Sequence, residues 1–89
     1  GNRLKNLPVS SNKSQIGHTL GASAAIEAAF GIEGMQRGIL LPTINYLPDP
    51  ELGEIDVVAD QARKSAYGCF LSNAFGFGGT NCCIVFKGV

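Results

Sequence analysis

The sequence predicts an α/β fold, and three observations support this prediction. Two segments of the last third, 66–73 and 82–86, are apolar without alternation, which is typical of strands covered on both faces. A helix rich in alanine and glycine is predicted over 19–37, and a short strand over 7–10. The expected order is strand, helix, surface loop, strand and strand, with helices above and below the sheet.

The opening elements are a short strand and a polar loop. Pro8 lies near the start of strand 7–10, where the missing backbone donor is tolerated. Residues 11–18 are polar and are predicted to form a loop that leads into the helix. Arg3 and Lys5 make the chain's start basic, and we interpret them as a solvated end, with contact to an acidic partner as the alternative.

The predicted helix 19–37 contains an unusual number of small residues. Glycine costs up to about 1 kcal/mol relative to alanine inside a helix, yet Gly21, Gly31 and Gly34 are all present. We therefore expect close backbone approaches and a helix buried on most faces. An alanine-rich surface helix is the alternative.

The ends and the exposed side of this helix also have candidate residues. Thr19 or Ser14 is the expected N-cap, and Gly38 is placed to end the helix in a left-handed conformation. Glu33 and Arg37 are one turn apart and predict an exposed ion pair.

The segment 42–64 is predicted to be an irregular surface connection, with a brief edge strand over 55–58. Proline and glycine interrupt it, and it holds most of the acidic residues: Asp49, Glu51, Glu54, Asp56 and Asp60. A glycine-rich connection, 74–81, then joins the two apolar strands.

The composition indicates part of a larger globular protein. The 89 residues carry seven basic and seven acidic side chains, a balance that argues against nucleic acid as a partner. Hydrophobic residues make up 45%, which excludes general disorder. Charged residues make up only 16%, against roughly 25% in an average soluble protein. We therefore expect other protein to cover much of the surface and the chain to be incomplete as a domain.

The cysteines and the histidine lack the spacing of a disulfide framework or a metal site. There are three cysteines, two of them adjacent, and one histidine far from all three. We expect buried, reduced thiols in a cytosol-like compartment, with no metal and no cofactor. No apolar run approaches the roughly 18 residues that a membrane span needs.

The glycine-rich connection does not match a phosphate-binding loop, because it joins two strands instead of a strand and a helix. Its glycines, Gly76, Gly78 and Gly79, supply backbone freedom, so that Phe77 would sit on a hinge. An ordinary hairpin turn with a buried phenylalanine is the alternative.

A second candidate feature is the pair Lys13 and His18 in the loop before the helix. The positive end of the helix dipole disfavours a second positive charge there, so His18 is expected to be neutral. A neutral imidazole can donate a hydrogen bond to a developing oxyanion. A capping or core histidine beside a solvated lysine is the alternative. No activated nucleophile is evident, since no GxSxG motif is present.

Two long motifs, 11–23 and 72–81, closely resemble the β-ketoacyl-acyl-carrier-protein synthases, the condensing enzymes of fatty-acid and polyketide synthesis. The family patterns are Ser-Ser-x-Lys-x-x-x-Gly-His-x-x-Gly-Ala and Asn-Ser-Phe-Gly-Phe-Gly-Gly-Thr-Asn, and Pro-Thr-Ile-Asn at 42–45 also resembles the family. The chain departs from the family at Ala24, where glycine is common, and at Ala74, where serine is common. The resemblance implies a thiolase-like α/β fold, of which residues 1–89 would form a C-terminal part.

By the same resemblance, the intact protein would be an acyltransferase that catalyses a decarboxylative Claisen condensation. Its substrates would be malonyl-carrier protein and an acyl thioester, its partner would be acyl carrier protein, and it would be a cytoplasmic homodimer without nucleic-acid or membrane partners. The family's nucleophilic cysteine and first histidine have no counterpart in these residues. The 89 residues alone are therefore expected to be inactive.

The resemblance also assigns roles to individual residues. His18 corresponds to the second catalytic histidine and Lys13 to the active-site lysine. The other corresponding positions are the substrate gate, Phe77 with Gly76, Gly78 and Gly79, and a supporting polar network, Glu27 and Asn81.

Two alternatives remain open. A non-catalytic chain-length-factor-like subunit or scaffold of the same fold would lack the nucleophilic cysteine upstream of these residues. An independent small binding module built around the glycine loop would fold and bind ligand alone.

Overall fold

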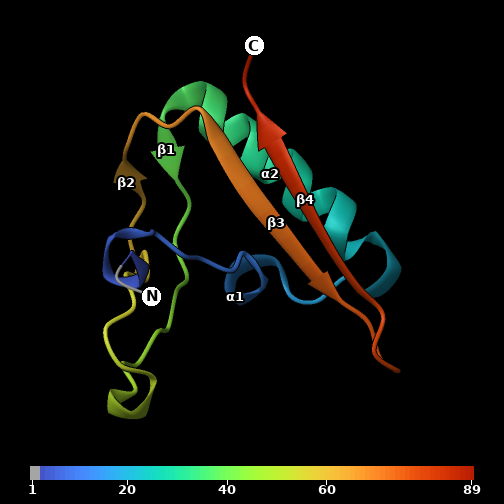
Figure 1. The fold of residues 1–89 in the computed structure, drawn as a ribbon, viewed down its shortest axis with the longest axis horizontal. Helices are drawn as coiled ribbons and strands as arrows, with labels where there is room; N and C mark the ends of the chain where they lie inside the picture. The colour runs from blue at the N-terminus through green and yellow to red at the C-terminus, as the bar shows by residue number, and fades with distance from the viewer. Residues whose placement is uncertain (1–2) are drawn as a thin grey trace.

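The computed structural model describes residues 3–89, so the first two residues of the predicted basic opening lie outside the described part. The helices are α1 (Lys13–Ile16) and α2 (Ser23–Arg37), with 3₁₀ turns at Leu4–Asn6, Leu20–Ala22 and Pro50–Leu52. The strands are β1 (Ile39–Leu40), β2 (Arg63–Lys64), β3 (Cys69–Phe75) and β4 (Asn81–Lys87). Figure 1 shows two parts: α2 with the β3–β4 hairpin, and an arm that contains β1, β2 and the long connection.

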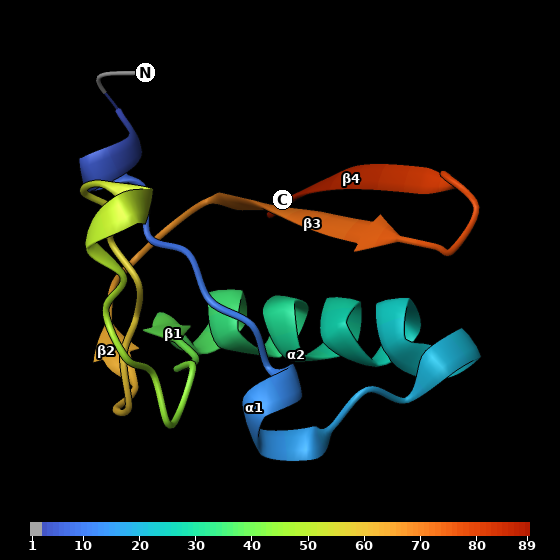
Figure 2. The ribbon, with the colours of Figure 1, turned by 90° about the horizontal axis from the view of Figure 1, so that it is seen from below.

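The β3–β4 hairpin packs one face against α2 (Figure 2). The two strands are antiparallel and pair Phe70 with Phe86, whose rings stack with centroids 4.9 Å apart. A Cβ atom at Gly31 would overlap the ring of Phe70. The close approach expected from this glycine is confirmed, because a larger residue would push the aromatic pair away from the helix.

The end of α2 is held by a second close approach. A Cβ atom at Gly34 would lie 2.8 Å from the carbonyl oxygen of Ile39, and that oxygen accepts a hydrogen bond from the Tyr67 hydroxyl at 3.0 Å. Gly38 ends the helix with φ +65°, as predicted. At Gly21, in contrast, a Cβ atom would meet nothing within 4 Å, so the expectation of a close approach there was wrong.

The start of the helix differs from the prediction. The segment expected to be helical from Thr19 begins as a 3₁₀ turn, and α2 starts at Ser23 with Ala22 as its N-cap residue and no side-chain cap. The expected caps were therefore wrong. Ser14 lies instead in α1, one helical turn within the predicted loop, where its hydroxyl accepts a hydrogen bond from the Ile44 backbone at 2.9 Å.

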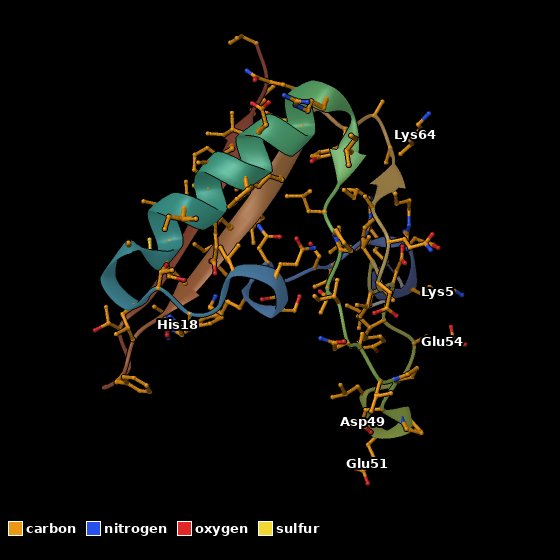
Figure 3. All side chains as sticks on the ribbon, turned by 180° about the vertical axis from the view of Figure 1, so that it is seen from behind. Lys5, His18, Asp49, Glu51, Glu54 and Lys64 are labelled. Carbon is orange, nitrogen blue, oxygen red and sulfur yellow. The ribbon has the colours of Figure 1, made fainter. Side chains whose placement is uncertain are left out.

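The predicted strand 7–10 is reduced to a single parallel bridge between Val9 and Val57. Segment 42–64 is mostly irregular, as expected, and Asp49, Glu51 and Glu54 project from it (Figure 3). It is not wholly on the surface, however, because Val58 is only 1% exposed, and backbone hydrogen bonds join it to both Val9 and Thr43. This crossing of three extended segments forms the small core of the arm.

The arm is closed by contacts that no local pattern predicted. β1 pairs with β2 in antiparallel register, Ile39 opposite Lys64. Arg63 donates two hydrogen bonds of 2.9 Å to the Asp56 carboxylate.

The predicted exposed pair on α2 is confirmed, since Arg37 Nε donates to Glu33 Oε1 at 2.5 Å.

The sheet is covered on one face only within the described residues, so the predicted helices above and below it are not both present (Figure 2). Alternation from Phe70 places Leu71 and Val85 on the outer face, where they are 54% and 64% exposed. Helix α2 is likewise not buried on most faces, because Phe30 is 40% exposed. The expectation of buried thiols was also wrong: all three cysteines are free and exposed, Cys69 and Cys83 on this outer face and Cys82 on the α2 side.

Candidate functional site

A cavity of about 350 Å³ lies where the start of α2 meets the turn end of the β3–β4 hairpin. Three sequence-predicted site residues from the first motif and the helix after it, Lys13, His18 and Glu27, line it together with Gly76 from the second motif. Figure 3 shows His18 at this junction of helix and hairpin. The fold therefore brings the two motifs to one place, although about fifty residues separate them in the sequence.

The imidazole of His18 is oriented by the backbone that follows it. Its Nδ1 atom accepts a hydrogen bond from the Leu20 N–H at 3.0 Å. An accepting Nδ1 carries no proton, so in this arrangement the neutral ring carries its proton on Nε2 and can donate from there. Leu20 provides this contact from a left-handed backbone conformation, φ +52°, which is unusual for a residue with a side chain.

Lys13 and Glu27 form an ion pair across the cavity wall. Lys13 Nζ donates to Glu27 Oε1, and the same oxygen accepts a hydrogen bond from the Ser23 hydroxyl at 3.1 Å. The side chain of Glu27 is 15% exposed and that of Lys13 is 39% exposed. The alternative of a capping or core histidine beside a solvated lysine is wrong for the lysine, because its ammonium group pairs with the Glu27 carboxylate. The capping part of that alternative agrees with the structure, since His18 accepts from the backbone N–H of Leu20.

The glycine loop forms the other wall and its tip points away from it. Gly76 lines the cavity, and its N–H donates to the Thr80 carbonyl at 2.6 Å. Gly78 and Gly79 have φ values of +88° and +89°, which side chains disfavour. Phe77 is fully exposed and is not among the lining residues, so the alternative of a buried phenylalanine in an ordinary turn is wrong.

Asn81 is the one residue of the predicted network that the structure does not bring to the cavity. It begins β4 opposite Phe75 and is exposed, and it is neither among the lining residues nor in the hydrogen bonds of Glu27. Within residues 3–89, the network around Glu27 therefore consists of Lys13 and Ser23.

Ser23 and Cys82 are among the lining residues that sequence reasoning did not assign to the site. Ser23 precedes Glu27 by four residues, a helical spacing that places both side chains on one face. Cys82 lines the cavity because it pairs with Ala74, which lies on the sheet face toward α2. The spacing of four residues could have predicted the contact between Ser23 and Glu27. The position of Cys82 could not be predicted in this way, because it depends on which face of the hairpin the helix covers.

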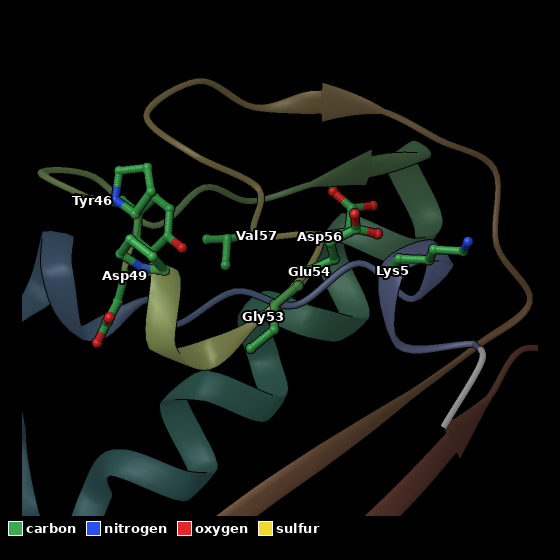
Figure 4. A pocket seen from close by; sticks show the side chains of 10 residues that line it. Lys5, Tyr46, Asp49, Gly53, Glu54, Asp56 and Val57 are labelled. Carbon is green, nitrogen blue, oxygen red and sulfur yellow. The ribbon is translucent and has the colours of Figure 1, made fainter.

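A second hollow, of about 480 Å³, lies on the arm and contains none of the predicted site residues (Figure 4). Lys5, Tyr46, Asp49 and Glu54 are among the residues around it. The open walls come from the irregular connection 46–57, and the two motifs do not reach it. We therefore take the cavity at the head of α2 as the candidate functional site.

The cavity combines an imidazole N–H donor, an ammonium group paired with a carboxylate and a glycine-lined backbone wall. Such a donor can stabilise negative charge that develops on a carbonyl oxygen without first losing a proton. In residues 3–89, no group of three histidine, cysteine or acidic side chains is arranged to hold a metal ion. None of the helices in that range is long and apolar enough to cross a membrane.

The Ala/Gly-rich helix and the hairpin are arranged as in solved beta-ketoacyl synthases, and the chain therefore has the fold of the C-terminal part of a thiolase-like condensing enzyme. Residues 1–47 match the family described as beta-ketoacyl synthase, C-terminal domain. The chain belongs to this family.

Individual relatives are similar to this chain over 93% of its length, in sequence and in structure. A 3-oxoacyl-[acyl-carrier-protein] synthase 2 of Vibrio harveyi is 48% identical over 84 residues, which are 93% of this chain and 20% of the relative. A crystal structure of a beta-ketoacyl synthase from Burkholderia phymatum STM815 superposes with a TM-score of 0.87 at 42% identity, over 93% of this chain and 21% of that one.

A second solved structure is a ketosynthase in complex with its type II PKS acyl-carrier protein. It is 33% identical to this chain, with a TM-score of 0.87 over 93% of this chain and 20% of that one. The chain thus spans about a fifth of the length of the relatives that it matches.

Proposed function

We propose that these residues form the C-terminal part of the active site of a 3-oxoacyl-[acyl-carrier-protein] synthase. The observation that supports this most is the meeting of His18, the Lys13–Glu27 pair and Gly76 in one cavity. Family membership supplies the reaction class, a decarboxylative Claisen condensation in fatty-acid or polyketide chain elongation.

In the proposed reaction, the malonyl thioester loses carbon dioxide, and the electron pair of the broken carbon–carbon bond forms an enolate. The Nε2–H of His18 donates to the thioester oxygen and stabilises its negative charge. The enolate carbon then attacks an acyl thioester on a cysteine from another part of the protein, and the cysteine thiolate leaves as the new carbon–carbon bond forms.

The other site residues have supporting roles in this proposal. Lys13, held by Glu27, contributes a fixed positive charge beside the cavity. Phe77 is the proposed substrate gate. Because its side chain is fully exposed and does not line the cavity here, the gate closes only when the loop brings the ring over the cavity, and the neighbouring glycines with positive φ allow that motion. The assignment of Asn81 to the polar network rests on the family resemblance, since Asn81 does not hydrogen-bond to Glu27 here.

The partners belong to the same proposal. Acyl carrier protein would deliver both thioesters, and the related type II ketosynthase, which forms a complex with its own acyl-carrier protein, supports this choice of partner. A homodimeric, cytoplasmic enzyme is the form that the family resemblance implies.

His18→Ala in the full-length protein that carries this sequence tests the central role. Because the variant lacks the donor, decarboxylation of malonyl-carrier protein should fall about 100- to 1000-fold. Acyl transfer to the cysteine should be largely retained, since it does not use this donor. The measurements are carbon dioxide release and acyl-enzyme formation, each in a separate assay.

His18→Gln is the matched control, because its side-chain amide retains an N–H donor. This variant should keep more decarboxylation activity than His18→Ala. Normal decarboxylation in His18→Ala would refute the assigned role. A full-length protein without any decarboxylation activity would favour the non-catalytic subunit instead.

A further inference from the structure

Ser23 is a buried polar residue without a role in the proposal above. It is 7% exposed, it begins α2, and it lines the cavity. Its hydroxyl donates to Glu27 Oε1 at 3.1 Å. A hydroxyl has a single proton to donate, so this bond uses the donor that a helical serine otherwise directs to its own backbone.

The acceptor atom is shared, and this gives the contact its significance. Glu27 Oε1 is also the atom that accepts from Lys13 Nζ, so one carboxylate oxygen receives donors from α1 and from α2. Lysine has a long flexible stem, and its ammonium group stays in one place only where a partner is itself fixed. The Ser23 bond restrains the glutamate carboxylate, and the carboxylate in turn restrains the lysine.

We propose that Ser23 is a positioning residue that fixes Glu27 and, through it, holds the Lys13 ammonium at the cavity wall. This inference deepens the proposed function and rests on it. Ser23 does not touch the reacting atoms. Its effect is on the placement of charge beside the oxyanion that His18 stabilises.

The test compares four variants of the full-length protein. Ser23→Ala removes the hydroxyl with little change in volume. Ser23→Thr keeps a hydroxyl and Ser23→Val has nearly the same shape without one, so this pair separates hydrogen bonding from packing. Ser72→Ala is the matched control, because it removes a hydroxyl from a half-buried β3 position that does not line the cavity.

Ser23→Ala should lower kcat for decarboxylation about ten-fold with KM unchanged, the loss expected when a hydrogen bond to a charged group disappears. Ser23→Thr should recover most of this rate and Ser23→Val should not, while Ser72→Ala should match the unaltered protein. Thermal unfolding of each variant verifies that the rates compare folded proteins.

Three outcomes would overturn the inference: an unchanged kcat in Ser23→Ala, equal rates in Ser23→Thr and Ser23→Val, or an equal loss in Ser72→Ala. If Ser23→Thr and Ser23→Val both fail to fold, the test rests on the other two variants. A lower kcat in Ser23→Ala than in Ser72→Ala then supports the inference, and equal kcat values overturn it. A failure of the proposed function is distinguishable, because the unaltered protein would then release no carbon dioxide.

Discussion

Gly34→Ala should destabilise the full-length protein, because a single methyl group would enter the contact between α2 and β1. The new Cβ atom would lie 2.8 Å from the Ile39 carbonyl oxygen and 3.1 Å from the Tyr67 hydroxyl, and ordinary contact begins at 3.4 Å. The backbone after the helix must therefore shift by roughly half an ångström.

The size of the effect follows from three contributions. Overpacking of this kind costs about 1–3 kcal/mol. Weakening of the Tyr67 hydrogen bond adds about 1 kcal/mol, and the better helix propensity of alanine returns about 1 kcal/mol. The expected net loss is therefore about 1–3 kcal/mol in the free energy of unfolding.

Denaturant unfolding followed by circular dichroism measures this loss. Gly21→Ala is the control, because a Cβ atom there meets nothing within 4 Å. It should stay within about 0.5 kcal/mol of the unaltered protein. If Gly34→Ala is as stable as Gly21→Ala, the inference that this glycine exists for a close approach is refuted.

Two further predictions concern the arm and the loop. Hydrogen bonds from Arg63, together with its charge, lower the pKa of Asp56 below 3.8. The pair therefore stabilises the fold above about pH 4, and this stabilisation is lost as the pH falls through the lowered folded-state pKa. Asp56→Asn should lower the free energy of unfolding by less than about 1 kcal/mol at neutral pH, since the pair is partly exposed. The difference in this free energy between the variant and the unaltered protein should shrink below about pH 4. A difference that stays constant on acidification, measured by denaturant unfolding, would contradict this prediction. Phe77→Ala should leave thermal stability unchanged, because the side chain is fully exposed, but should alter the rate of acyl-enzyme formation, and an unaltered rate would place the gate elsewhere.

Local patterns predicted the elements that short-range physics determines. The glycine-rich segment between two apolar runs predicted the β3–β4 hairpin, and Gly31 and Gly34 predicted close contacts on α2. The pairing of β1 with β2 was not predicted, because each strand has two residues and the pairing depends on the return of a long irregular connection. The burial of Val58 has the same origin, since three distant segments meet there.

Some residues of the site were predicted and others were not, because the site also depends on which distant segments pack together. The motif residues His18 and Gly76 come from distant segments, and family resemblance rather than local pattern indicated that they belong together. The exposure of the cysteines was wrongly predicted because an apolar strand pattern does not say which face another element covers. The helix spacing of Ser23 and Glu27 is present in the sequence, but its meaning depends on Lys13, which reaches the same oxygen from α1.

The left-handed backbone conformation of Leu20 has two effects: it determines which residues fit at this position, and it orients the ring of His18. Any side chain at this residue strains the main chain by about 1–2 kcal/mol, and glycine would relieve that cost. The same conformation aims the amide of Leu20 at the imidazole. Glycine at this position would therefore stabilise the fold. It would also let the main chain move the amide of residue 20 away from the imidazole, and the ring could then turn and exchange its tautomer more freely.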